Sequence, residues 1–152
     1  MKTLLNPQDT AEILARVQAV RPDSARQWGR MTPHQMMCHL TDSFVGMMGG
    51  KAVSNKSNFF SRSVMKWLAL QLPMPWPHGV KTRPEMDQEI GGTPPQEFAP
   101  DRQKLRQAIE QFAAPQRAFA FHPHPIFGAM KETEWMIWGY KHADHHLRQF
   151  GV

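Results

Sequence analysis

The chain has 152 residues, of which 41% are hydrophobic and 20% charged, and its formal net charge is +5. This length and composition predict one globular domain spanning residues 1–152, with a true hydrophobic core. Cys38 is the single cysteine, which excludes an internal disulfide. A signal-peptide pattern and a membrane-spanning apolar run are both absent, so we expect a cytoplasmic protein.

Two helical patterns occupy the N-terminal part of the chain. Residues 7–20 carry apolar side chains at helical spacing. The second helix has a clear start, because Thr32 can cap it and Gln35 completes a capping box three residues later. The pair Gly49-Gly50 ends this helix.

Three further helices are predicted, separated by irregular segments. They cover about 58–72, 101–113 and 131–149. The stretch 73–100 is rich in proline and glycine and predicts a long loop, and the prolines of 121–128 exclude a helix there. Four main helices and an additional N-terminal one predict an all-α fold, a four-helix bundle with long loops.

The final helix places two histidines on its apolar face. A helix advances about 100° per residue, so His142 and His146 share one face with Trp135 and Trp138. Charged residues fall on the opposite side. Two histidines four residues apart can bind a single metal ion. Without a metal, they would be a buried pair hydrogen-bonded to Gln149, to Asp42 or to backbone carbonyl groups.

A third metal ligand must come from a facing helix, because catalytic metals usually take three protein ligands and one water. His39, on the flank of the second helix's apolar stripe, is the best candidate. His145 lies at the edge of the inner face of the final helix, where it can be a ligand, a neighbour of the ligands or a proton shuttle. His34 is expected to be exposed. His145, His34 and Asp42 are the candidates for moving protons.

Several segments resemble one known family. They are Met36-Met-Cys-His-Leu40, His124-Pro-Ile-Phe-Gly128, Glu134-Trp135 and Lys141-His-Ala-Asp-His-His-Leu-Arg-Gln-Phe150. Together they resemble the DinB-like (YfiT-like) superfamily of metal-dependent enzymes, and more narrowly a bacterial branch of it. The likeness is dense over 122–152 and thinner over 27–45.

This resemblance implies a four-helix bundle with up-down-down-up connectivity and a long crossover between the second and third main helices. It also implies a divalent metal, nickel or zinc, held by His39, His142 and His146. Better-studied relatives are isomerases and transferases that use a low-molecular-weight thiol, and such bundles often form homodimers. The activity implied is that of a thiol-dependent transferase or a hydrolase acting on a small molecule.

The basic segment 51–83 supports alternative functions. No acidic residue lies between Asp42 and Glu85, whereas six lysines and arginines do. The segment can hold an anionic substrate, or it can bind a membrane surface or a nucleic acid as part of a non-catalytic bundle. No DNA-reading motif is present, which makes nucleic acid the weaker partner. A third alternative is a structural homodimer with a vestigial metal site.

Two further residues have alternative roles. Cys38 is expected to be a packing residue, since it points about 100° away from His39 on the helical wheel. His124 lies between prolines, and we expect it to be a loop residue that is hydrogen-bonded locally. The alternative is that His124 and Phe127 shape the entrance to the site.

Overall fold

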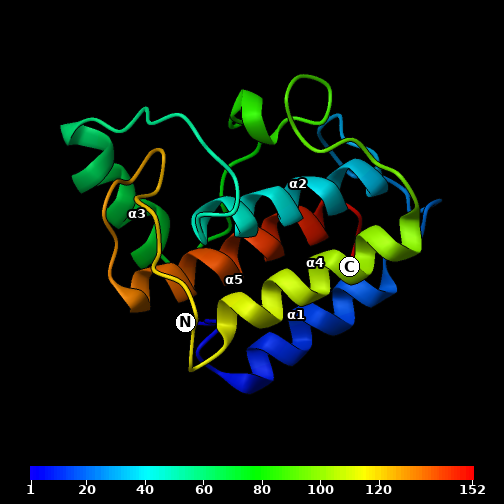
Figure 1. The fold of residues 1–152 in the computed structure, drawn as a ribbon, viewed down its shortest axis with the longest axis horizontal. Helices are drawn as coiled ribbons and strands as arrows, with labels where there is room; N and C mark the ends of the chain where they lie inside the picture. The colour runs from blue at the N-terminus through cyan, green and yellow to red at the C-terminus, as the bar shows by residue number, and fades with distance from the viewer.

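The computed structural model describes residues 1–152, and it contains helices and no β-strand. The helices are α1 (Pro7–Ala19), α2 (Pro33–Met47), α3 (Lys66–Gln71), α4 (Phe98–Ala113) and α5 (Glu132–Arg148). A π-helical turn, Ser61–Met65, leads into α3, and a short 3-10 turn covers Pro84–Met86. The predicted all-α bundle is confirmed (Figure 1).

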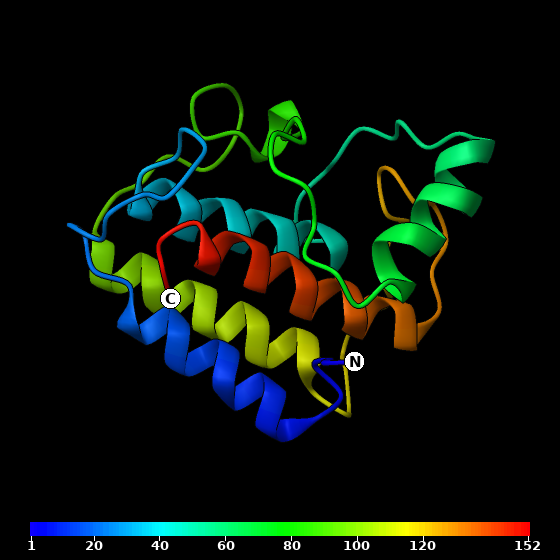
Figure 2. The ribbon, with the colours of Figure 1, turned by 180° about the vertical axis from the view of Figure 1, so that it is seen from behind.

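Four of the helices form the bundle. α1 packs against α4 and α5, and α2 packs against the same two helices. Figures 1 and 2 show that α1 and α5 run in one direction while α2 and α4 run in the other, so the connectivity is up-down-down-up. The long crossover between α2 and α4 carries α3 and the 3-10 turn.

The bundle helices begin where their sequences predict. Thr32 accepts a hydrogen bond from the Gln35 backbone N–H (3.1 Å), and the Gln35 side chain accepts one from the Thr32 N–H (2.9 Å), which is the predicted capping box. Asn6 caps α1 through its bond with the Gln8 N–H. α4 begins at Phe98, three residues before the predicted start, because Pro100 lies in its first turn, where a proline costs no hydrogen bond.

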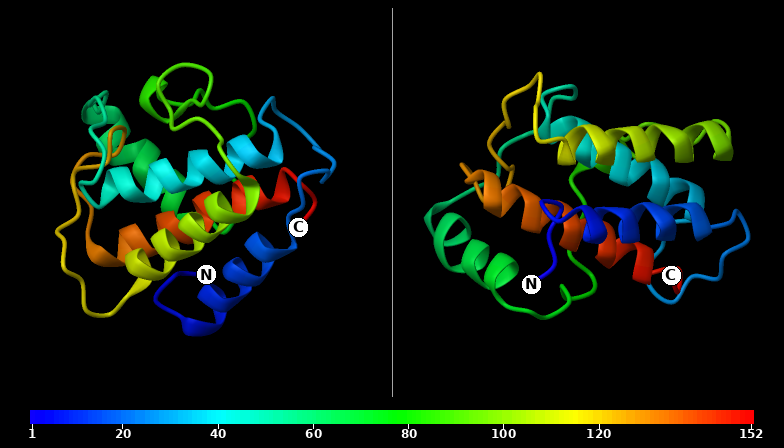
Figure 3. Two further views of the ribbon diagram at one scale, coloured as in Figure 1. Left: turned by 45° about the vertical axis from the view of Figure 1, so that its right-hand side comes forward. Right: turned by 90° about the horizontal axis from the view of Figure 1, so that it is seen from below.

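The helix outside the bundle is α3. We had expected the additional helix to be the N-terminal one, α1. Ile13 and Val17 of α1 are fully buried between α4 and α5. In the 59–71 segment, by contrast, Leu70 is the one buried apolar side chain, and Trp67 is 57% exposed. Figure 3 shows α3 at one end of the bundle, and α5 is the bundle helix that it packs against. Helical spacing predicted both helices, but it did not show which of their apolar faces would pack against the bundle.

Aromatic side chains from three helices meet in the core. Phe112 of α4 lies edge-on to Phe44 of α2, with ring centroids 4.9 Å apart, and close to Trp138 of α5 at 5.9 Å. Gly139 of α5 allows this approach, because a Cβ atom there would lie 2.7 Å from Leu4 Cδ1 and 3.1 Å from Phe112 Cε1. None of the helices has both the length and the apolar character that crossing a membrane requires.

Candidate metal centre

Three histidines from two helices converge between α2 and α5. They are His39, His142 and His146, and their potential ligand atoms all lie within 4.8 Å of one another. His39 and His146 are buried, and His142 is partly buried. The Nε2 atoms of His39 and His142 are 3.3 Å apart. The structure therefore brings together the three residues that the sequence suggested as ligands.

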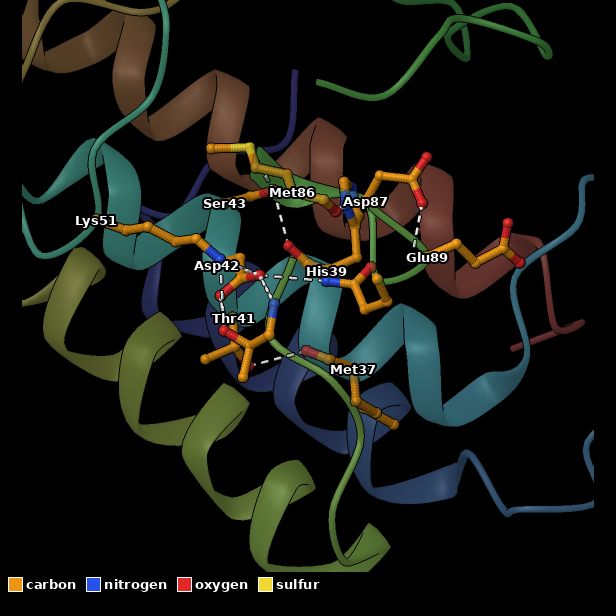
Figure 4. Close-up of polar contacts among 11 residues, drawn as sticks. Met37, His39, Thr41, Asp42, Ser43, Lys51, Met86, Asp87 and Glu89 are labelled. Carbon is orange, nitrogen blue, oxygen red and sulfur yellow. Dashed lines mark hydrogen bonds and ion pairs between the residues drawn. The ribbon is translucent and has the colours of Figure 1, made fainter. Parts of the chain in front are cut away.

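A backbone carbonyl group orients His39. The Nδ1 atom of His39 lies 2.8 Å from the Met86 carbonyl oxygen. Because a carbonyl can only accept, Nδ1 carries the proton and Nε2 keeps its lone pair. Met86 belongs to the 3-10 turn of the crossover, so this contact ties the segment to α2 at His39; Figure 4 shows the two residues side by side.

A side-chain amide orients His146 in the same way. Gln149 donates from Nε2 to the Trp28 carbonyl oxygen (2.8 Å), which turns its Oε1 toward His146. Oε1 lies 3.2 Å from His146 Nδ1, so this nitrogen donates and Nε2 keeps its lone pair. Hydrogen bonds from the second nitrogen to a carbonyl or carboxamide are the usual support of metal-binding histidines.

The spacing and the chemistry of these nitrogens fit a divalent metal. Two nitrogens bound at ~2.0–2.1 Å to one tetrahedral zinc lie ~3.3 Å apart. The His39–His142 distance matches this value. Without a cation, the contact between the two Nε2 atoms is a hydrogen bond in which His142 must donate its Nε2 proton, because His39 Nε2 carries only a lone pair. The Nδ1 atom of His142 is buried and has no hydrogen-bond partner. His142 thus lacks the orienting contact that the other two histidines have.

Burial keeps these imidazoles neutral. It lowers the pKa of His39 and places the pKa values of His142 and His146 well below the ordinary histidine value, and their mutual proximity adds to the effect at the last two. A metal binds only the neutral imidazole. The three residues are therefore held in the protonation state that ligation needs at neutral pH.

A cavity of about 470 Å³ opens directly onto the three histidines. This volume lies within the range of small-molecule sites. Its walls come from α3, from the Leu72–Pro77 strap, from the loop before α5 and from Trp138. Lys141 holds the wall in place by donating to the carbonyl groups of Ala69 and Leu72 (2.7 and 2.6 Å), which ties the end of α3 to α5.

His124 is 6% exposed and lines this cavity. It is a locally bonded loop residue, as we expected, but it also forms part of the cavity wall. Its Nδ1 accepts the backbone N–H groups of Ile126 (3.2 Å) and Phe127 (3.1 Å). Nδ1 is thereby unprotonated, and the ring carries its proton on Nε2. Nε2 has no protein partner and is left free to donate. The sequence signal was the His-Pro-x-Phe-Gly motif, whose Gly128 returns the loop to His124 through two 2.8 Å backbone bonds.

We expect the metal-free protein to lose stability as the pH falls below about 6.5. Burial lowers the pKa of His124 from 6.5 to about 3. Between these values the unfolded chain binds a proton that the folded chain excludes, so acid favours unfolding, at a cost of up to about 1.4 kcal/mol per pH unit for such a group. Urea unfolding with a chelator present, from about pH 7 to about pH 4, measures the slope.

The His124→Asn variant is the control for this pH dependence. Its amide oxygen can still accept the two backbone N–H bonds, but the side chain does not titrate. We expect a shallower fall of the unfolding free energy with pH. An equally steep fall in the variant would contradict the assignment.

His145 lies at the rim of the cavity rather than in the histidine cluster. Its ring centroid is 6.3 Å from that of Trp76 and 6.1 Å from that of His78, and it lines the cavity. Burial lowers its pKa. His145 is therefore placed to exchange a proton with a molecule in the cavity, and that role stays a prediction.

Asp42 points away from the cavity, which it does not line. Its carboxylate accepts hydrogen bonds from the Thr93 N–H (2.7 Å) and hydroxyl group (2.6 Å) and pairs with Lys51 (2.7 Å) (Figure 4). These contacts fasten the crossover to α2. Proton transfer by Asp42 stays a prediction, and its contacts argue for a structural role.

A second group of potential ligands surrounds Asp101 at the start of α4. The Asp101 carboxylate binds His34 Nε2 (2.8 Å), the Lys104 ammonium group (2.8 Å) and the Gln96 N–H (2.9 Å). Burial and this carboxylate raise the pKa of the Cys38 thiol to about 12, so it stays protonated. The group is a closed hydrogen-bond network that already contains a cation, the Lys104 ammonium group. Cys38 is buried within it, which agrees with the packing role expected for this residue. His34, which we expected to be exposed, is partly buried in it.

No curated protein and no solved structure matches this chain. A family model, however, matches residues 2–151, nearly the whole length. On that match, the chain belongs to the family described as "Protein of unknown function (DUF1569)".

Proposed function

We propose that this protein is a DinB-like metal-dependent enzyme in which His39, His142 and His146 hold a divalent ion, nickel or zinc. One observation carries the proposal. The three imidazoles meet at the floor of an open cavity, and for two of them the hydrogen bond at Nδ1 leaves Nε2 free to ligate. Such outer hydrogen bonds support ligands in metal sites.

The ligand set favours catalysis over a purely structural site. Three neutral imidazoles leave the ion its full charge, and three protein ligands leave a position open toward the cavity. A divalent ion in this place supplies Lewis-acid chemistry, which lowers the pKa of a water or a thiol that binds it. The apolar walls limit access of bulk water to the same position.

The single cysteine of the chain is not the nucleophile. Cys38 is buried outside the cavity, and its pKa of about 12 keeps the thiol protonated. We assign the nucleophile to a molecule that enters the cavity and binds the ion, either water or a small thiol, which corresponds to a hydrolase or a thiol-dependent transferase. His124 donates its Nε2–H to an acceptor atom of the substrate, and His145 exchanges protons at the rim.

The test is the metal content of protein purified without an affinity tag, measured by plasma mass spectrometry. We expect about one equivalent of nickel or zinc in the wild type and a loss of the metal in His146→Ala. His122→Ala is the matched control, since His122 is exposed and outside the cluster. A wild type that takes up no added metal would refute the proposal. The alternative functions would then be a bundle that binds an anionic partner through segment 51–83, or a structural homodimer.

A further inference from the structure

The cavity above the histidines has walls of two kinds of segment. It is closed on one side by α3 and the strap that follows it, and on the other by the loop carrying His124. Its walls are formed mainly by apolar and aromatic side chains, among them Met65, Leu68, Trp76, Ile126, Phe127 and Trp138. A molecule that fills it must therefore present an apolar body.

One polar group of this wall is satisfied within the protein. The Trp76 indole N–H donates to the Ala69 carbonyl oxygen (2.8 Å), so the ring offers only its apolar surface to the cavity. The Nε2–H of His124, by contrast, has no protein partner and lies in a residue that lines the cavity. Apolar walls with a few placed polar groups are typical of sites for small organic molecules.

The charge of the cavity is positive. No aspartate or glutamate lines it, whereas Lys81 and Arg83 do. Lys81 is exposed and forms no ion pair. The Arg83 guanidinium donates to the Ser54 hydroxyl group and pairs with Glu85 at 3.9 Å, while its Nε atom is buried without a hydrogen-bond partner. These two cations attract an anion in the cavity and repel a cation.

From these features we propose that the cavity binds a small amphipathic anion, with an aliphatic or aromatic body and one negatively charged group. The charged group pairs with Arg83 and Lys81, and the apolar body crosses the cavity toward the three histidines. This inference rests on the proposed function in that the cavity is the substrate site. The binding itself needs only residues of this chain.

The test uses three probes with the same ten-carbon chain: decanoate, decan-1-ol and decylammonium. Titration calorimetry on chelator-treated, metal-free protein measures the affinity and the stoichiometry, with the two ionic probes below their micelle concentrations and decan-1-ol below its solubility limit. We expect one decanoate per chain, bound about tenfold or more tighter than decan-1-ol, because a charge-assisted hydrogen bond is worth that factor. Decylammonium is expected to bind most weakly.

Two variants and a control locate the binding. Arg83→Gln should weaken decanoate binding about tenfold and leave decan-1-ol unchanged. Leu68→Glu, on the wall of the cavity, should weaken decanoate through repulsion. Lys56→Gln removes a cation of the same basic segment that does not line the cavity, and it should change nothing.

Equal binding of the three probes, tighter binding of decylammonium, or an unaltered decanoate affinity in Arg83→Gln would overturn the inference. So would the absence of decanoate binding. Because the measurement is made without metal, the two proposals fail separately. Decanoate binding by a protein that takes up no metal would refute the metal enzyme alone, and metal uptake without decanoate binding would refute the amphipathic anion alone.

Discussion

Zinc is expected to raise the unfolding temperature of the wild-type protein and to leave that of His142→Ala unchanged. A ligand at about a thousand times its Kd stabilises the folded state by about 4 kcal/mol. For a chain of this size that corresponds to about 8–16 °C. His142 is one of the three proposed ligands, and its Nε2 lies 3.3 Å from His39 Nε2. Its removal leaves two imidazoles, which cannot complete the site.

A graded series of variants separates loss of the site from general damage. Gln149→Ala removes the acceptor that orients His146 and should weaken zinc binding about 10–100-fold while one ion still binds. His122→Ala, an exposed histidine, should respond to zinc as the wild type does. Differential scanning calorimetry with and without zinc measures all four proteins. Equal stabilisation of His142→Ala by zinc would show that the ion binds elsewhere on the chain.

The Phe112→Ala substitution should cost about 3–5 kcal/mol of unfolding free energy. Phe112 is fully buried, and its ring meets those of Phe44 (4.9 Å), Phe121 (5.0 Å) and Trp138 (5.9 Å). The truncation removes the aromatic contact between three helices and leaves a cavity that a close-packed core cannot fill. Urea denaturation measures the loss. Since Trp138 also lines the ligand cavity, we expect weaker ligand binding as well.

Phe59→Ala is the matched control for the core substitution. Phe59 precedes α3 and is 89% exposed, so its truncation should change the unfolding free energy by less than about 0.5 kcal/mol. Comparable losses for the two variants would mean that the 59–71 segment is buried in solution. That result would contradict the arrangement in which α3 lies outside the bundle.

Local patterns in the sequence determined most of the helices. The capping box of Thr32 and Gln35 acts between neighbouring residues, so it can be read without knowledge of the fold. The same holds for His142 and His146, because helical geometry alone puts residues four apart on one face. The sequence also singled out His39 as the third histidine, through its place on a facing helix and through family resemblance.

Tertiary packing decided the rest, because the relevant contacts join segments far apart in the chain. Both α1 and the 59–71 helix carry apolar residues at helical spacing, yet only α1 packs against two helices, α4 and α5. Asp42 lies close to His39 in sequence, but loop residues from the crossover bind its carboxylate and turn it from the cavity. His124 lines the cavity because its loop folds back, with two backbone hydrogen bonds between His124 and Gly128. The cavity itself exists because α3 stands apart from the bundle, which no local pattern determines.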